Sequence, residues 1–254
     1  KHILLEKPVG RTAQEAREVV KACDAAGVSL GIVFQTRMTE AALKAKELLA
    51  SGTLGALGVA EISVPWWRPQ SDYDEPGRGT YARDGGGVLI SQAIHAMDLA
   101  LSMTGPVQTV QAMAATSRFH AMESEAFVTA GLTFRDGAIG SLQASTASFP
   151  GDGESITLHC DNASMRLGKG QLDVHWRDGR HDIHGAAGGS GGGADPMAFT
   201  HEWHQAIIED MAEAIVTARP PVAPGQAALA AHALIEAITL SARDGRTVTL
   251  EQPL

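Results

Sequence analysis

The chain opens with a short apolar strand that runs directly into a charged turn. Residues 3–5 (Ile-Leu-Leu) have the pattern of a strand covered on both faces, and Glu6, Lys7 and Pro8 follow at once. Open α/β sheets bind their ligands at the carboxyl ends of their strands. Pro8 restricts Lys7 to an extended backbone, so the turn predicts a lysine aimed at such a ligand. A solvated lysine is the commoner reading of an isolated Glu-Lys-Pro turn, and the downstream sequence has to decide between the two.

The next segments complete a strand–helix–strand unit. Residues 12–26 have helical periodicity, with Thr12 as the N-cap and Gly27 as the stop, and 28–34 is a second short apolar run. Such a unit favours a parallel sheet. Because two strands do not make a stable sheet alone, we expect residues 1–36 to be the last part of a larger nucleotide-binding domain.

The remainder, residues 37–254, has strands that follow one another in hairpin order between helices. This order predicts an α+β domain with a large, mainly antiparallel open sheet flanked by helices. Helices are expected over 40–50, 89–103, 197–218 and 226–243. Strands are expected over 56–66, 107–117, 126–134, 138–145, 155–160, 163–167 and 171–176.

A histidine of chemical interest follows three consecutive glycines. The glycines at 85–87 allow a tight turn into the helix expected over 89–103. On that helix Ser91, His95 and Asp98 are spaced i, i+4 and i+7, which predicts that they share one face. A lone histidine on a partly apolar helix is more often structural. One turn into a helix that opens from a glycine turn, however, it can point at a ligand, and its ordinary pKa suits proton transfer.

A polar loop over 66–80 supplies candidate substrate contacts. Arg68, Tyr73 and Arg78 combine two guanidinium groups with an aromatic ring, which suits a carboxylate or a phosphate. A solvated loop is an equally good interpretation and stays open. His204 is a further candidate for the same pocket, although a structural role is the commoner one for such a residue.

Two matches to known motifs fail on their context. The run 189–194 fits a dinucleotide fingerprint in spacing, but no buried strand precedes it and Asp195-Pro196 follows it, as in a flexible loop. His201-Glu202-Trp203-His204 resembles a zinc-protease helix, yet the second histidine would have to occupy position 205, which is Gln205. We therefore predict no metal site. The other histidines, which form no ligand spacing, are His2, His120, His159, His175, His181, His184 and His232.

Composition excludes several classes of partner. The net charge of −9 comes without a basic stripe, so nucleic acid is not expected to bind. No segment is apolar for long enough to cross a bilayer, and we expect no membrane partner. Cys23 and Cys160 lie far apart in ordinary contexts, which favours reduced thiols and a cytoplasmic protein.

Taken in order, these motifs resemble the glucose–fructose oxidoreductase/inositol dehydrogenase (Gfo/Idh/MocA) family. The resemblance covers nearly the whole chain. It is carried by Leu5-Glu6-Lys7-Pro8, by Trp67-Arg68, Tyr73 and Arg78-Gly79-Thr80, by Asp84-Gly85-Gly86-Gly87 with His95 and Asp98, and by His204, Arg219-Pro220-Pro221 and Ser241-Ala242-Arg243.

The resemblance implies a Rossmann domain that binds NAD or NADP, of which residues 1–36 would be the C-terminal remnant. It implies that Lys7 and His95 are catalytic and that Glu6, Lys7 and Pro8 contact the cofactor. Ser91 would contact substrate, at a position where many members have Asp and others Asn. A hydroxyl carries no negative charge that would raise the pKa of His95.

The expected function is hydride transfer between a nicotinamide cofactor and a secondary alcohol of a sugar, nucleotide sugar, cyclic polyol or dihydrodiol. The alternative is a non-catalytic ligand-sensing or regulatory protein on the same scaffold. The fragment by itself is expected to bind no cofactor if the phosphate-binding turn is absent. An open sheet face with Val128, Leu132 and Leu142 exposed would be costly, so we expect a homodimer or homotetramer through that face.

Overall fold

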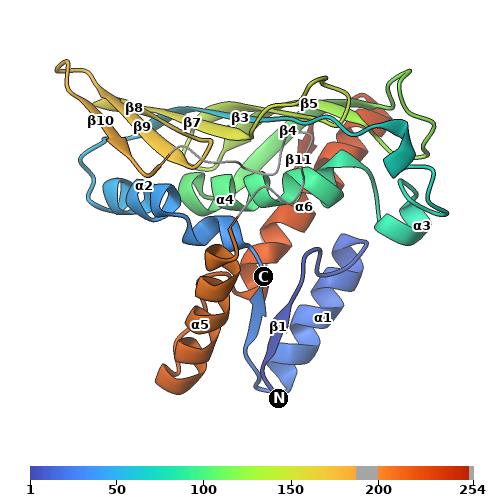
Figure 1. Ribbon diagram of the computed structural model, residues 1–254, viewed down its shortest axis with the longest axis horizontal. Coiled ribbons are helices and arrows are strands. Elements are labelled where there is room, and N and C mark those ends of the chain that lie inside the picture. Colours follow the sequence, from blue (N-terminus) through green and yellow to red (C-terminus); the bar gives the residue numbers. More distant parts are fainter. Residues whose placement is uncertain (187–199, 252–254) are drawn as a thin grey trace.

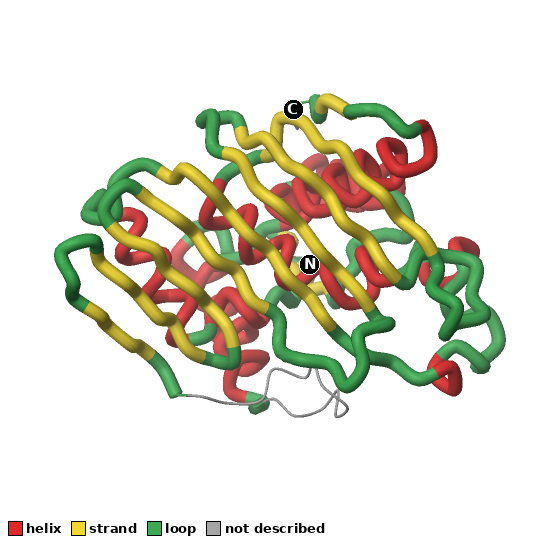
Figure 2. Tube along the Cα trace, turned by 90° about the horizontal axis from the view of Figure 1, so that it is seen from above, coloured by secondary structure: helices red, strands yellow, loops and turns green. Residues whose placement is uncertain are grey.

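The computed structural model describes residues 1–186 and 200–251. One large sheet forms a layer, and helices lie under one of its faces (Figure 1). Seen from above, the strands lie in front and the helices behind them, so the other face is open over the described residues (Figure 2). The expected α+β class with a large open sheet is confirmed. The glycine-rich run 189–194 and the expected helix start at 197–199 lie outside the described residues.

A small unit of two parallel strands and one helix lies below the helical layer (Figure 1). Its strands β1 (Ile3–Leu5) and β2 (Leu30–Ile32) are joined by α1 (Ala13–Ala25), which the Thr12 hydroxyl caps as expected. The unit is not isolated, because the long helix α6 (Gly225–Asp244) packs on it in one apolar cluster. That cluster joins segments from both sides of residue 36, and the domain boundary there stays a prediction.

The large sheet has nine strands: β3 (Leu57–Pro65), β4 (Val107–Ala115), β5 (Phe127–Phe134), β6 (Ile139–Ser145), β7 (Ser155–Cys160), β8 (Ala163–Gly168), β9 (Gln171–Trp176), β10 (His181–His184) and β11 (Val248–Thr249). Their order is β10-β9-β8-β7-β3-β6-β5-β4-β11. Only β3 and β6 are parallel neighbours among these described strands. The edge strands β10 and β11 were not predicted, because both are short and neither has an apolar run.

The remaining helical segments are η1 (Gln35–Met38), α2 (Glu40–Ala50), η2 (Gln70–Asp72), α3 (Tyr81–Asp84), the π turn η3 (Leu89–Ala93), α4 (Ile94–Thr104) and α5 (Glu202–Thr217). Helices α2, α4 and α6 lie against the sheet, whereas α5 projects away from it beside β1 and β2 (Figure 1). In the described part of the chain, none of the helices combines the length and the apolar composition that a membrane span requires.

The expectation that apolar residues occupy the open face is wrong for the residues named. Val128, Leu132 and Leu142 are at most 4% exposed and belong to the core under the helices. Because side chains alternate between the two faces of a strand, the open face receives exposed residues such as Thr129 and Ser141. The alternation is visible in the sequence, but it does not say which face the helices cover. These leucine and valine side chains therefore give no reason for copies to associate.

The helix that carries His95 begins with a wider turn than expected. Residues 89–93 form the π turn that precedes α4, and a π turn holds more residues than an α turn. Side chains before and after it therefore lose the spacing of a regular helix. Ser91 and His95 line one cavity, whereas Asp98 is 1% exposed and bonds to Arg37. His95 and Asp98 both lie in the regular helix α4, and a face shared by all three residues stays a prediction.

Glycine is required at position 87, where two backbone segments meet. A Cβ there would overlap the backbone of Glu125. The buried Glu125 carboxylate accepts hydrogen bonds from the N–H groups of Gly87 and Leu89, at the start of the helical segment that carries His95. Burial raises the pKa of Glu125, and these N–H groups oppose the shift. The glycine turn thus fixes where that helical segment begins.

We expect Gly87→Ala to lower the free energy of unfolding by about 1–3 kcal/mol, the usual cost of overpacking a filled site. The cost arises because backbone atoms, and not a flexible side chain, would have to move. Gly131→Ala on β5 is the matched control, since no neighbouring heavy atom lies within 4 Å of the added Cβ. Urea unfolding measures both variants. Equal stability of the two would contradict the close approach at Gly87.

Candidate active site

A cavity of about 280 Å³ is lined from the end of β1, from η1, from η3 and α4, from the large sheet and from the start of α5. It brings together six residues singled out in the sequence: Glu6, Lys7, Arg68, Ser91, His95 and His204. Pro8, Tyr73 and Arg78 are not in its lining. The other lining residues are Gln35, Thr36, Val64, Trp66, Gln92, Ala96, Glu154 and Trp203.

Lys7 enters the lining from the carboxyl end of β1. Its Nζ donates a hydrogen bond of 3.0 Å to the backbone carbonyl of Ser91. Burial lowers the pKa of Lys7; the Glu6 carboxylate opposes this shift and the Arg78 guanidinium adds to it. The ammonium is therefore held in one direction and gives up its proton more readily than a solvated lysine does.

His95 is a neutral imidazole in this cavity. Burial lowers the pKa of His95 to about 3, and the positive charges of Lys7 and His204 add to the shift. Its ring meets that of Phe34 edge-on, with 5.9 Å between the centroids. The expectation that the pKa of His95 lies near neutrality is not met. The lone pair of the ring is free of a proton at pH 7.

Three buried polar atoms in the wall have no hydrogen-bond partner within the described part of the chain. They are Oε1 of Gln35, Oγ1 of Thr36 and Nδ1 of His95, and only Oγ1 of Thr146 joins them elsewhere in that part. Buried polar atoms nearly always have partners, so their gathering at one cavity indicates a polar ligand. The cavity also lies at the carboxyl end of a parallel strand, where α/β sheets bind nucleotides. These residues fit the polar end of a nicotinamide cofactor beside a hydroxylated substrate.

Arg68 places a fixed positive charge on the sheet side of the cavity. Its guanidinium carbon lies 5.0 Å from the centroid of the Trp66 ring, and its Nη1 donates to the carbonyl of Trp67. Burial lowers the pKa of Arg68, yet a guanidinium stays protonated at physiological pH. Nε1 of Trp66 in turn donates to a carboxylate oxygen of Glu154 at 3.3 Å. This wall therefore combines an aromatic face with charges of both signs.

Tyr73 and Arg78, in the loop that carries Arg68, contact residues outside that loop. The ring of Tyr73 meets that of His120 edge-on at 5.0 Å, and Nε2 of His120 lies 2.8 Å from the carbonyl oxygen of Arg68. Nη1 of Arg78 lies 3.7 Å from a carboxylate oxygen of Asp84. Direct contact of Tyr73 and Arg78 with a substrate stays a prediction.

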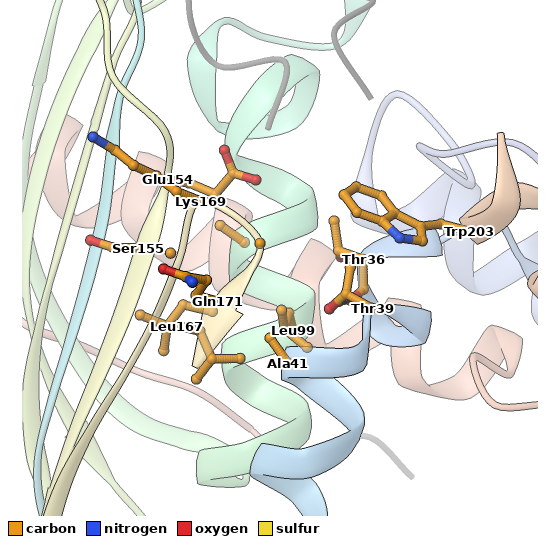
Figure 3. A pocket seen from close by; sticks show the side chains of 14 residues that line it. Thr36, Thr39, Ala41, Leu99, Glu154, Ser155, Leu167, Lys169, Gln171 and Trp203 are labelled. Carbon is orange, nitrogen blue, oxygen red and sulfur yellow. Dashed lines mark hydrogen bonds between the residues drawn. The ribbon is translucent and has the colours of Figure 1, made fainter. Parts of the chain in front are cut away.

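A smaller apolar pocket of about 60 Å³ adjoins the cavity (Figure 3). Trp203, at the start of α5, stands on one side of it, and Leu167 of β8 stands on the other. Glu154 lies in the loop before β7, where no periodicity marks it in the sequence. The one available signal for Trp203 was a large aromatic residue beside His204. Both spaces are lined by Thr36, Ala96, Glu154 and Trp203.

Comparison with known proteins finds relatives that match the chain along nearly its whole length. The family model described as the GFO/IDH/MocA C-terminal domain matches residues 42–166. A D-apiose dehydrogenase of Paraburkholderia graminis is 28% identical, over 98% of this chain and 66% of its own length. The scyllo-inositol 2-dehydrogenase (NADP⁺) IolW of Bacillus subtilis is 22% identical, over 99% of this chain and 73% of its own length.

Among solved structures, the WlbA dehydrogenase of Bordetella pertussis in complex with NADH and UDP-GlcNAcA is 30% identical. The match has a TM-score of 0.81 and covers all of this chain and 73% of that one. The chain therefore spans about two-thirds to three-quarters of the length of these relatives.

A second buried histidine supports the turn that carries Lys7. Nε2 of His232, on α6, accepts a hydrogen bond of 3.3 Å from the backbone N–H of Val9. Burial lowers the pKa of His232 to about 4, and the charge of Arg17 adds to the shift. Accepting from an N–H requires the neutral ring, so protonation of His232 and retention of this hydrogen bond exclude each other.

We expect the free energy of unfolding to fall as the pH drops from 6.5 towards 4. The folded pKa values of His95 and His232 lie below the unfolded value of 6.5, so the unfolded chain takes up protons first. Below pH 6.5, each of the two histidines then lowers the free energy of unfolding by about 1.4 kcal/mol for every pH unit. His232→Gln should flatten the slope, and His201→Gln, at an exposed position, should not. Denaturant unfolding across this pH range tests it; an unchanged slope in H232Q would contradict it.

Proposed function

The chain belongs to the Gfo/Idh/MocA family of oxidoreductases, and on that premise we propose that it forms the substrate-binding and catalytic part of an NAD(P)-dependent dehydrogenase. Its substrate is a secondary alcohol of a sugar, nucleotide sugar, cyclic polyol or dihydrodiol. One observation carries the proposal. Lys7 and His95, from segments far apart in the sequence, line one cavity in which several buried polar atoms have no partner among the described residues.

In the proposed reaction the two side chains serve one substrate oxygen. Neutral His95 accepts the hydroxyl proton as the carbinol carbon is oxidised. The Lys7 ammonium donates a hydrogen bond to the same oxygen and stabilises the alkoxide charge that develops on it. Because its pKa is lowered, the Lys7 ammonium shares its own proton with the substrate oxygen more readily than an ordinary lysine would. The carbonyl of Ser91 orients Lys7 for this role.

Bound NAD or NADP supplies the hydride acceptor. The turn Glu6–Pro8 is the proposed contact, and Gln35 and Thr36 offer unpartnered polar oxygens beside it. The distinction between NAD and NADP lies outside the features of this cavity.

A ligand-sensing protein on the same scaffold is the alternative. It is favoured by Ser91, which carries no charge beside His95, and by the low pKa of that histidine, which makes the ring a weak base. A sensor would bind the alcohol in the same cavity without oxidising it.

Turnover and binding can be separated with variants of the two proposed catalytic residues. Lys7→Met and His95→Ala should each lower turnover about 100-fold or more, the low end of a general acid–base contribution. Alcohol binding, followed by quenching of Trp66 and Trp203 fluorescence in the cavity wall, should change little. Lys21→Met, at an exposed position on α1, is the control and should keep the turnover and the alcohol binding of the wild type.

Reduction of NAD or NADP on addition of candidate alcohols measures turnover. Full turnover in K7M or H95A removes that residue from the mechanism. Quenching by an alcohol with no reduction of bound cofactor supports the sensor instead. The fluorescence of added NADH separates a sensor from a chain that holds no cofactor.

We further propose that the substrate carries an anionic group that Arg68 binds. The guanidinium lines the cavity as a fixed cation, with Nη1 donating to the carbonyl of Trp67 and Nε lying 3.7 Å from a carboxylate oxygen of Asp72. Its planar group suits a carboxylate or a phosphate. Arg68→Met should raise the KM for an acidic sugar about 10- to 100-fold, as expected from the loss of a hydrogen bond to a charged group. The KM for the neutral analogue should hardly change. Equal effects on both sugars would contradict the assignment.

Association into a homodimer or homotetramer through the open sheet face stays part of the proposal. Its support is the family resemblance together with an uncovered face (Figure 2). That face carries exposed hydroxyl and amide side chains such as those of Thr129 and Gln143, together with the exposed apolar side chains of Met113 and Ile139, so the interface would be mixed.

A further inference from the structure

Three potential metal ligands stand together on the outermost hairpin of the large sheet. β10 is the edge strand and pairs only with β9 in that sheet. In the register of the pair, His181 lies opposite His175, and Asp173 precedes His175 by two residues. Side chains two apart on a strand share a face. Since the alternate residues Leu172 and Val174 are buried under the helices, these three side chains stand on the open face.

The potential ligand atoms of the three side chains lie close together. Nε2 of His181 lies 2.6 Å from Oδ1 of Asp173, and Nε2 of His175 lies 3.1 Å from the same oxygen. The two imidazole rings are stacked with 4.2 Å between centroids and 9° between planes. All three ligand atoms lie within 4.8 Å of one another. Two histidine nitrogens and one carboxylate oxygen are therefore presented together, without any change in backbone.

We propose that this hairpin binds a divalent transition-metal ion, zinc above all, through Asp173, His175 and His181. Imidazole nitrogen and carboxylate oxygen are the ligands that zinc takes in proteins, at about 2.0–2.2 Å. The ion replaces the hydrogen bond between Nε2 of His181 and Asp173 and the contact between Nε2 of His175 and the same oxygen, and each ring keeps its proton on Nδ1. Three protein ligands leave a fourth position open for water. The side chains are 42–65% exposed, so solvent reaches that position and the rings have room to tilt.

The ion would join the edge strand β10 to its neighbour β9. Edge strands have one side without ladder partners, and a metal held by both β9 and β10 would hold the outer hairpin closed. One group opposes binding. Arg166 of β8 lies opposite Asp173 in register, on the same face, and its charge repels a cation. The sequence analysis predicted no metal site because the three ligands meet only through hairpin register, which no linear spacing reveals.

Isothermal titration of the untagged chain with zinc chloride tests the proposal. We expect saturable uptake of one ion per chain. His175→Ala and His181→Ala should each weaken binding by about 10- to 100-fold or more, since even the loss of an outer-shell partner has that effect. His184→Ala is the matched control, because His184 lies on the same strand but on the other face. Arg166→Gln should bind zinc more tightly than the wild type does.

Hydrogen exchange of the β10 amides gives a second readout, and zinc should slow it in the wild type but not in H175A. Melting temperatures without zinc should be the same in the wild type, H175A, H181A and R166Q, because these side chains are exposed. Absence of saturable uptake, or equal zinc affinity in H175A, H181A and H184A, would overturn the proposal. These assays use no nicotinamide cofactor or alcohol, so their outcome is independent of the proposed enzyme function.

Discussion

The cavity depends on a buried ion pair that lies outside its lining. Arg37 donates from Nε and Nη2 to the two oxygens of Asp98, at 2.7 Å each, and from Nη1 to the carbonyl of Val222. Both side chains are at most 7% exposed. Such a pair adds little net stability, but removing one partner leaves a buried charge and costs about 3–5 kcal/mol. The pair therefore permits one arrangement of η1, α4 and the segment before α6. Because η1 carries Thr36 and α4 carries His95, that arrangement fixes two walls of the site.

The other walls rest on α6 and on the glycine turn. Val9 donates to His232 of α6, which holds the turn after β1, and the Lys7 ammonium then reaches the carbonyl of Ser91. Glu125 holds the start of the helical segment from the opposite side. The two proposed catalytic groups thus come from different parts of the chain but share one frame. A long apolar helix that packs on both the small unit and the sheet domain makes that possible.

Local signals in the sequence were sufficient for most elements, and the failures have physical causes. Thr12 and the helix over 40–50 were predicted correctly because capping and periodicity are local. The convergence of Lys7 and His95 followed from a family resemblance, since no local rule brings such distant segments together. The π turn before α4 was not predicted, because it leaves no mark in apolar spacing. Three further features depend on tertiary packing and were not predicted. They are the face of the sheet that the helices cover, the pairing of β10 with β9, and the position of Glu154 in the cavity wall.

Burial is the main cause of the lowered pKa values of both Lys7 and His95, and it determines which side chains of the cavity carry a charge. Two cations beside the guanidinium of Arg68 would repel one another in a space that water solvates poorly. The protein avoids this by keeping His95 neutral, so that Lys7 and Arg68 are the cations near the bound ligand. A ligand that brings negative charge, whether a carboxylate at Arg68 or an alkoxide at Lys7, offsets that repulsion and draws the pKa of His95 upward. Proton uptake by the imidazole then becomes easier just as the substrate oxygen loses its proton. The electrostatics of the cavity are therefore compatible with the proposed role of His95 as a base that gains strength as its substrate binds.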